Sequence, residues 1–243
     1  MGKHGHFVID ADGHGGEPAD WQDRMPAKFQ PLMAARRERI KKQFANLPGV
    51  GAVLNRARVE AGASMAVFGL GGIGLSCVQG GVLAGAAKIV AVDVVPAKLE
   101  LARRLGATDV VDANRDDPVA AIRDLTRGGA DYTFEAVGNL AVIRQALDAL
   151  GPGGALTIVG VPKLGSKLDF VVHALYQNKA ILGCRYGTAR PRRDFPMLAD
   201  LYLGGRLRID ELITRRYRLD EFAVALEDLR RAALARGVFM LEG

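Results

Sequence analysis

Three glycines, Gly69, Gly71 and Gly74, have the spacing G-x-G-x-x-G between an apolar run and a helical pattern. In such a turn the first glycine permits a tight bend, and the second lets main-chain N–H groups approach a pyrophosphate. The third lets the helix pack closely on the strand, and the N-terminus of that helix adds partial positive charge for phosphates. The turn therefore predicts a dinucleotide site.

Asp93 ends the next apolar run, at the offset where a carboxylate accepts hydrogen bonds from the adenosine ribose of a dinucleotide. A carboxylate at this place also repels a 2′-phosphate, which favours NAD over NADP. The alternative is that Asp93 only forms a turn at the end of a strand.

Apolar runs alternating with helical patterns predict the elements that position these residues. Strands are expected at 65–69, 88–93, 109–112, 131–136, 155–160 and 179–184, and helices at 72–85, 96–105, 117–127, 139–149 and 191–203. The alternation is typical of βαβ units, whose right-handed crossovers place helices on both faces of a parallel sheet. The predicted fold class is α/β, a doubly wound parallel sheet of the Rossmann type, with its ligand crevice at the carboxyl ends of the strands.

The two ends of the chain depart from this alternation. Near the start we expect a short strand at 7–10 and a basic amphipathic helix at 27–46. Near the end we expect an extended segment at 212–217, a helix at 220–231 with Asp220 as its N-cap, and a short strand at 236–241.

The charge balance excludes some classes of partner. The net charge is +6, and arginines cluster at 185–193 and 215–218, but aromatic residues are only 6% and no nucleic-acid motif accompanies the arginines. We interpret the clusters as a solvated basic face that helps attract an anionic dinucleotide, with no nucleic acid as partner. Residues 61–87 carry no charge but contain the glycine turn, so we interpret them as strand, turn and helix, with no membrane partner.

Cysteine usage and the first residues bear on the compartment. The two cysteines, Cys77 and Cys184, make no disulfide framework, and no CxxC spacing indicates a zinc site. No apolar stretch follows the opening residues as it would in a secretory signal, and we expect a cytoplasmic protein.

Five stretches of the chain carry a family resemblance: Val-Gly-Ala-Val-Leu-Asn (50–55), Ala-Val-Phe-Gly-Leu-Gly-Gly-Ile-Gly (66–74), the segment 91–107, Asp-Tyr-Thr-Phe-Glu-Ala-Val-Gly-Asn (131–139), and Ile-Val-Gly-Val-Pro (158–162). Together they resemble the zinc-type alcohol dehydrogenases of the medium-chain dehydrogenase/reductase family. The likeness covers roughly residues 49–241 and is specific through its combination of motifs.

The resemblance implies NAD as the cofactor and assigns roles at its phosphates and adenosine ribose. Gly71, Gly72 and Ile73 would present main-chain N–H groups to the pyrophosphate, which Arg236 would also reach. Asp93 would hold the adenosine ribose.

Other positions would serve the nicotinamide half. Val137 would lie near the adenine-side ribose or the nicotinamide. Val159 and Val161 would contact the nicotinamide ring and its carboxamide. Cys184 and Tyr186 match positions that offer main-chain groups to that carboxamide.

Plainer interpretations stand beside these roles. Lys98, placed beside Asp93 by the resemblance, could equally be a solvated helix residue. The three valines could be core residues at strand ends. Cys77 is expected to be a small buried residue of the first helix, and Cys184 likewise of a strand.

In this family the catalytic zinc is held by Cys and His, and the last zinc-ligand cysteine lies just before the segment matching 51–55. Here residues 43–50 contain no cysteine, and none precedes Cys77. Oxidation of an alcohol to a carbonyl by hydride transfer needs the oxygen to be polarised, which the cofactor does not do. Zinc is expected for the family but its ligands are missing, so we expect a cofactor-holding chain that is impaired alone. The alternative is a non-catalytic NAD-binding module or pseudoenzyme.

Residues 7–29 resemble instead the opening of a metal-dependent amidohydrolase, in which Asp12 and His14 would match metal ligands. A β/α barrel needs about eight strands and ~250 residues, so we expect no working metal site, and a hydrolase is the third hypothesis. The predicted organisation is an amidohydrolase-like fragment or extension (1–48), an NAD-binding Rossmann domain (49–211), and a C-terminal helix and strand (212–243).

In the family the segment matching 220–241 packs on an N-terminal catalytic domain, which we expect this chain to lack. We therefore expect an uncovered surface formed by Phe222, Ala225, Leu226, Leu229 and the strand Val238–Leu241. An apolar patch or strand edge of this kind favours association, so a homo-oligomer is a further hypothesis.

Overall fold

The computed structural model describes residues 7–9, 47–231 and 234–240, which form two compact units. The α/β unit is Leu47–Thr188. The terminal unit contains the described residues of both chain ends, 7–9, 189–231 and 234–240. The predicted helix at 27–46 lies outside the described residues, and the predicted domain boundaries stay predictions.

The α/β unit is built on a six-stranded sheet in the order β4-β3-β2-β5-β6-β7, with every neighbouring pair parallel. Its strands are β2 (Ser64–Phe68), β3 (Lys88–Asp93), β4 (Asp109–Asp112), β5 (Ala130–Glu135), β6 (Leu150–Ile158) and β7 (Ala180–Gly183). The chain runs outward from β2 in one direction and then returns to its other side at β5, so the strand order reverses there. This confirms the predicted doubly wound sheet and puts its switch point between β2 and β5.

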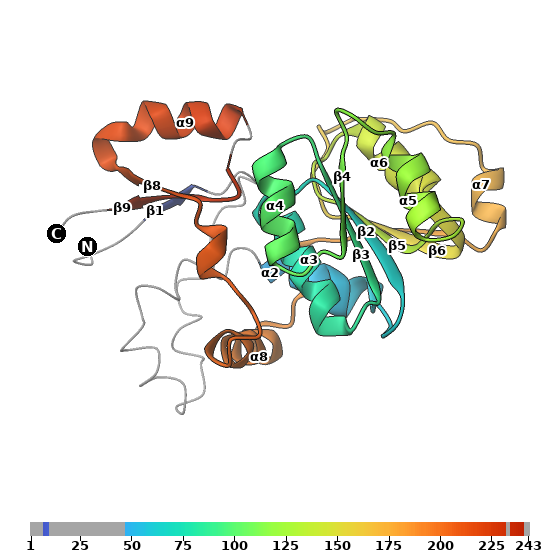
Figure 1. Cartoon of the computed structure of the whole chain (residues 1–243), viewed down its shortest axis with the longest axis horizontal. Helices are drawn as coiled ribbons and strands as arrows, with labels where there is room; N and C mark the ends of the chain where they lie inside the picture. The colour runs from blue at the N-terminus through green and yellow to red at the C-terminus, as the bar shows by residue number, and fades with distance from the viewer. Residues whose placement is uncertain (1–6, 10–46, 232–233, 241–243) are drawn as a thin grey trace. The chain divides into compact units, whose positions relative to one another are not determined.

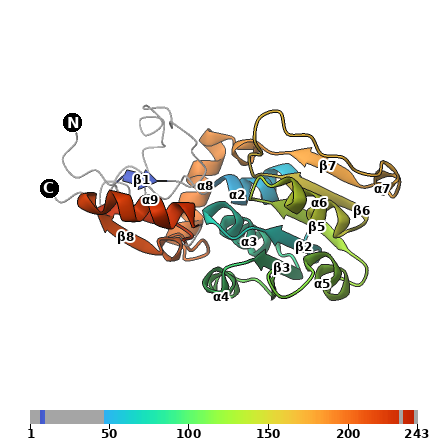
Figure 2. The ribbon, with the colours of Figure 1, turned by 90° about the horizontal axis from the view of Figure 1, so that it is seen from above.

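Helices cover both faces of this sheet (Figure 1 and Figure 2). The long ones are α3 (Gly72–Ala84), α4 (Pro96–Arg104), α5 (Pro118–Leu125) and α6 (Leu140–Asp148). Figure 1 shows α3 and α4 on one side of the strands and α5 and α6 on the other. Shorter elements complete the unit: α2 (Leu47–Gly51), the π-helix η3 (Ala52–Ala57), α7 (His173–Tyr176) and η4 (Tyr186–Thr188).

Alternating strand residues fill the two layers of the core. Phe68 and Val92 face the layer of α5 and α6, where they join one buried cluster with Ile122 and Ile143. On the other face α3 lies so close that a Cβ on Gly81 would collide with Met65 and stand 3.0 Å from Ile89. The two central strands β2 and β3 are buried on both faces, which explains why their sequences are mostly apolar.

Most predicted elements occur within two residues of their expected bounds, and their ends have local causes. Asp117 accepts a hydrogen bond from Val119 N–H at 2.9 Å and begins α5, and Asn139 accepts one from Ala141 N–H at 2.8 Å and begins α6. One exception is β6, which begins at Leu150 because that residue already pairs with Ala130 before an irregularity in the ladder. The other is the extended segment expected at 212–217, because η5 reaches Leu212 and β8 begins only at Arg215.

The uncharged segment 61–87 divides into the end of a loop, β2, the glycine turn and α3, as predicted. Among the described residues, no helix has both the length and the apolar character needed to cross a membrane.

The terminal unit holds a three-stranded sheet of order β1-β9-β8. Its elements are β1 (Phe7–Ile9), α8 (Pro191–Leu203), η5 (Asp210–Leu212), β8 (Arg215–Arg218), η6 (Leu219–Glu221), α9 (Phe222–Arg230) and β9 (Gly237–Met240). Strand β1 pairs antiparallel with β9, and β8 pairs parallel with its other edge. The expectation that this last strand lacks a partner is therefore wrong, because the chain's own residues occupy both of its edges.

Two further expectations at this end need correction. Asp220 is not an N-cap, because the turn η6 begins before it and Arg218 N–H donates to Glu221 Oε2 at 2.7 Å. The face of α9 is not uniformly uncovered: Ala225 is buried with Tyr217 and Phe239, whereas Phe222 is 53% exposed.

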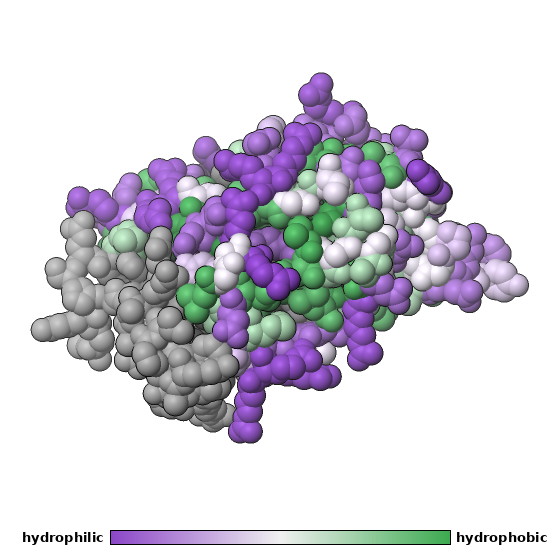
Figure 3. Space-filling view, turned by 60° about the horizontal axis from the view of Figure 1, so that its bottom comes forward, coloured by the Kyte–Doolittle hydropathy of each residue, from purple (hydrophilic) through white to green (hydrophobic). Residues whose placement is uncertain are grey.

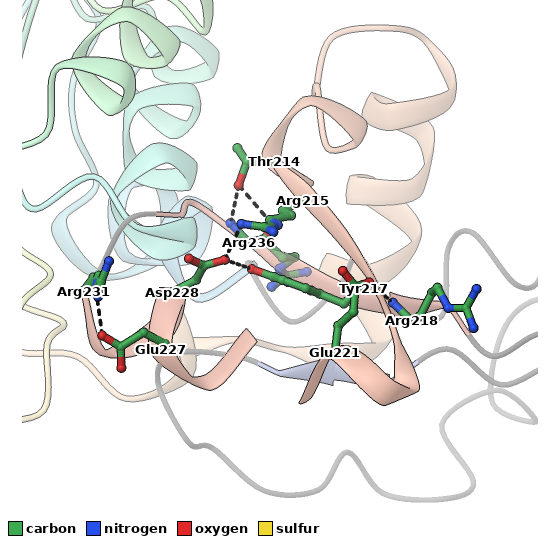
Figure 4. Close-up of polar contacts among 9 residues, drawn as sticks. All are labelled: Thr214, Arg215, Tyr217, Arg218, Glu221, Glu227, Asp228, Arg231 and Arg236. Carbon is green, nitrogen blue, oxygen red and sulfur yellow. Dashed lines mark hydrogen bonds and ion pairs between the residues drawn. The ribbon is translucent and has the colours of Figure 1, made fainter. Parts of the chain in front are cut away.

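A polar network ties β8 to α9 (Figure 4). The Tyr217 hydroxyl donates to Asp228 Oδ2 at 2.6 Å, and Arg215 Nη1 reaches the same oxygen at 2.8 Å. The Arg215 guanidinium also lies 5.0 Å from the centre of the Tyr217 ring. Burial, followed by the hydrogen bond and charge of Asp228, raises the pKa of Tyr217 to about 12.

The arginine clusters are exposed, in agreement with a solvated basic face. All of Arg185, Arg190, Arg192 and Arg193, and all of Arg215, Arg216 and Arg218, are exposed. Several pair with neighbouring acids, as Arg193 does with Asp194 at 2.6 Å. Hydrophilic side chains also project around the margins of the surface shown in Figure 3.

The pairing of β1 with β9 leads to a prediction about association. Deleting residues 1–10 should expose the β9 edge and increase self-association, because unpaired main-chain N–H and C=O groups accept another strand. Light scattering across a concentration series would measure this, with deletion of residues 1–5, which spares β1, as the control. Equal association of the two deletion variants would contradict the pairing.

Candidate functional site

The glycine turn has the geometry that its spacing predicts. Gly69 has φ +87°, a conformation that side-chain-bearing residues rarely adopt. A Cβ on Gly74 would collide with the main-chain oxygen of Gly69, so only glycine allows α3 to approach the turn this closely. Gly69 also faces the Val137 side chain, which a Cβ there would strike. The turn thus lies at the switch point of the sheet.

The N-terminus of α3 is open. Among the residues that the structure describes, nothing lies within 4 Å of the place where a Cβ on Gly71 would be, and no side chain caps this helix end. The first helical hydrogen bond runs from Leu75 N–H to Gly71 O at 2.9 Å. Helix geometry therefore leaves the N–H groups of Gly72, Ile73 and Gly74 without an intrahelical acceptor, which is the arrangement that binds phosphate.

Asp93 connects the glycine turn to the next strand. Its Oδ2 accepts a hydrogen bond from Leu70 N–H at 2.6 Å, and its Oδ1 accepts from Val94 and Val95 N–H at 2.8 and 2.9 Å. The residue is 8% exposed. A carboxylate has about four acceptor positions, so Oδ2 can still accept from a ribose hydroxyl. The turn-forming interpretation of Asp93 is correct, and it leaves the ribose interpretation open.

Lys98 is buried beside this carboxylate, so its interpretation as a solvated helix residue is wrong. It lies in the first turn of α4 and is 6% exposed. Burial lowers the pKa of its ammonium group, and the charge of Asp93 opposes that shift.

Glu135, which the sequence analysis missed, organises the turn after β5. It is fully buried, and its Oε1 accepts hydrogen bonds from Val137 and Gly138 N–H at 2.8 and 2.7 Å. Among the described residues, Oε2 has no hydrogen-bond partner. Burial raises the pKa of this carboxyl, and main-chain N–H donors from Val137, Gly138 and Asn139 oppose the shift. An acid at the end of an apolar strand, as at Asp93, was the available signal.

The three valines differ in exposure. Val159 is buried, whereas Val137 and Val161 are 53% and 66% exposed at the carboxyl ends of β5 and β6. The core interpretation therefore holds for Val159 alone. The turns that carry them pack together, since a Cβ on Gly138 would lie 2.5 Å from Val161 O.

Cys184 and Tyr186 follow β7 at the same edge of the sheet. Cys184 N–H donates to Ile158 O at 3.0 Å, and the thiol is partly buried just beyond the strand rather than within it. Burial raises the pKa of both the Cys184 and the Cys77 thiols. Cys77 lies in α3 and is fully buried, as expected. Tyr186 is exposed, with φ +51°.

The structure thus brings all but one of the implied cofactor-binding residues to one edge of the α/β unit. The exception, Arg236, belongs to the terminal unit, where it is 4% exposed and its main chain pairs with Thr214. Asp12 and His14 lie outside the described residues. Within the described part of the chain, no group of three or more His, Cys, Asp or Glu side chains could hold a metal ion. These residues do not fit the zinc expected from the resemblance.

Comparison with known proteins identifies the family. The family model of zinc-binding dehydrogenases matches residues 72–203, more than half of the chain. The chain belongs to this family. Its α/β unit is the coenzyme-binding domain of zinc-type alcohol dehydrogenases, as the following relatives also indicate.

Over 182 residues the chain is 42% identical to an alcohol dehydrogenase class-3 of Cereibacter sphaeroides, covering 71% of this chain and 48% of that protein. The solved benzyl alcohol dehydrogenase of Acinetobacter calcoaceticus is 34% identical with a TM-score of 0.80, covering 84% of this chain and 57% of that one. A proposed zinc-binding dehydrogenase of Sinorhizobium meliloti 1021, solved with NADP bound, is 27% identical with a TM-score of 0.71, covering 89% and 61%. The chain spans about half the length of the curated relatives it matches.

Substitution by alanine should affect stability very differently at Gly71 and Gly74, the two glycines on either side of the start of α3. Gly74→Ala should cost about 3 kcal/mol of unfolding free energy, because the new methyl group meets main-chain oxygen that cannot rotate away. Gly71→Ala, with open space around it, should change stability by less than about 1 kcal/mol. Denaturant unfolding would measure both, and equal effects would contradict this geometry.

The buried carboxyl of Glu135 predicts a pH-dependent stability difference. A carboxyl whose folded pKa is raised stabilises the fold most when protonated, and that contribution is lost as pH rises from its ordinary value of 4.5 through the raised pKa. Glu135→Gln cannot titrate, so its melting temperature should increase relative to wild type as the pH rises above 4.5. Glu100→Gln, at an exposed position, is the control, and a difference independent of pH would refute the prediction.

Proposed function

We propose that this chain binds NAD(H) at the carboxyl edge of its sheet and acts as the coenzyme-binding part of a zinc-type alcohol dehydrogenase. The observation that carries the proposal is the hydrogen bond between Leu70 N–H and Asp93, which holds the glycine turn and the acid in one arrangement. In that arrangement the pyrophosphate would meet the open N-terminus of α3. The adenosine ribose would donate to Asp93 Oδ2.

The same carboxylate supports a preference for NAD over NADP. A 2′-phosphate would bring about two negative charges against a nearly buried acid that already accepts three main-chain hydrogen bonds. The Sinorhizobium meliloti relative has NADP bound, so both dinucleotides deserve to be compared in this chain. Lys98, buried beside Asp93, would contact the ribose.

The nicotinamide would lie beyond the glycine turn, where Val137 and Val161 expose apolar surface and Tyr186, after β7, is exposed. There Val159, Cys184 and Tyr186 would contribute the contacts that the resemblance implies. For Arg236, which belongs to the terminal unit, the pyrophosphate contact that the resemblance implies stays a prediction.

The reaction proposed for the whole family member is oxidation of an alcohol, or of a hydroxymethyl adduct, to a carbonyl by hydride transfer. The described residues can hold the dinucleotide but include no metal site that would polarise the alcohol oxygen. This favours a second candidate, a non-catalytic NAD-binding module. Zinc stoichiometry and alcohol-dependent formation of NADH separate the two candidates.

Three finer hypotheses stay predictions. They are an amidohydrolase-like N-terminal segment using Asp12 and His14, a cytoplasmic location, and self-association through the surface around Phe222. The first concerns residues outside the described part of the chain.

The test is the ratio of dissociation constants for NADPH and NADH, measured by titration of nucleotide fluorescence. The wild type should bind NADH at least about 10-fold more tightly, and Asp93→Ala should bring the ratio close to one because the repelling charge is gone. A ratio is insensitive to general damage to the turn. Asp112→Ala is the matched control, since Asp112 is the acid paired with Asp93 at the end of β4.

Failure of the wild type to bind either nucleotide would overturn the proposed function. An unchanged ratio in Asp93→Ala would overturn the role of Asp93 alone. Gly71→Ala should fold but lose about 10-fold or more in NADH affinity, because its methyl group occupies the space a phosphate needs.

A further inference from the structure

Glu135 binds two different turns at the carboxyl edge of the sheet. Its side-chain Oε1 accepts the N–H groups of Val137 and Gly138 in the turn after β5. Its main-chain oxygen accepts the N–H groups of Val159 and Gly160 after β6, both at 2.8 Å. One residue therefore fixes the positions of both turns.

These turns fit against each other with little freedom. A Cβ on Gly138 would lie 2.5 Å from Val161 O, and a Cβ on Gly160 would lie 2.8 Å from Glu135 Oε2. Removing the side chain at 135 takes away the acceptor of the Val137 and Gly138 N–H groups and leaves space beside Gly160, so the two turns lose the contact that fixes one against the other. The two exposed valines, Val137 and Val161, would move with them.

The carboxyl is also costly to bury. It has no exposed surface, and Oε2 lacks a hydrogen-bond partner among the described residues. An apolar residue would fill this place in the core without that cost, but it would leave the N–H groups of Val137 and Gly138 unsatisfied. We infer that the buried acid is needed to hold the two turns in their positions.

We propose that Glu135 is a positioning residue for the nicotinamide half of the bound dinucleotide, acting through the Val137 and Val161 turns rather than by contact with the reacting atoms. The inference rests on the proposed function, since it assigns a role within that site. It separates two acids at the same edge: Asp93 serves the adenosine half through the glycine turn, and Glu135 serves the nicotinamide half. Loss of either acid should affect different parts of the ligand.

The experiment compares NADH with ADP-ribose, which lacks the nicotinamide, by calorimetric titration of each variant. The ratio of their dissociation constants gives the nicotinamide contribution. Glu135→Ala should reduce this contribution about 10-fold and change ADP-ribose affinity less than about twofold. Glu135→Gln retains an acceptor at Oε1 and should restore the wild-type ratio. Asp93→Ala, the matched control, should weaken both ligands together.

Each outcome is decisive. Loss of NADH affinity alone, restored by Glu135→Gln, supports the positioning role. The positioning role is overturned if the variant loses affinity for both ligands equally, which leaves the ratio unchanged. It is also overturned if the ratio of the wild type shows no nicotinamide contribution. In both cases NADH binding, and with it the proposed function, is retained. A wild type that binds neither ligand overturns the proposed function itself. If Glu135→Ala does not fold, Glu135→Val replaces it, because its side chain fills part of the buried space but accepts no hydrogen bond, and it should show the same selective loss.

Discussion

The hydrogen bond between Leu70 N–H and the Asp93 carboxylate is the constraint on which the candidate site depends. It joins the end of β2 to the end of β3, and with the close contact of Gly74 on Gly69 it sets the direction in which α3 leaves the sheet. A charged acceptor makes such a bond stronger than a neutral one, and burial shields it from water. The open helix N-terminus, and therefore the proposed phosphate site, follows from this local arrangement.

The same physical solution is used twice in one sheet. Asp93 and Glu135 each end a buried strand, and each accepts main-chain N–H groups from the turn that follows. Turns at the carboxyl ends of parallel strands have N–H groups that no ladder can satisfy, and an acid placed there satisfies several at once. The two acidic side chains therefore stabilise these tight turns, as the neighbouring glycines also do.

Sequence patterns predicted the sheet, its order of elements and the glycine turn well, because these depend on local spacing and periodicity. They failed where a feature depends on residues far away in the sequence or on the register in which two strands pair. The contacts of Glu135 depend on how β5 pairs with β6. Asp220 was wrongly assigned as a cap because the turn begins earlier, at Leu219. The partner of β9 comes from residues near the other end of the chain. No local pattern could predict the pairing of Phe7 with Phe239.

That pairing has a consequence for how the protein is made. The sheet β1-β9-β8 cannot be completed until β9 has left the ribosome, long after β1 has been synthesised. Pairing β1 with β9 closes a much longer loop, at a higher entropic cost, than the βαβ units of Leu47–Thr188 require. The α/β unit can therefore fold during translation before β1 has its partner, which leaves the edge of β1 available to other nascent strands.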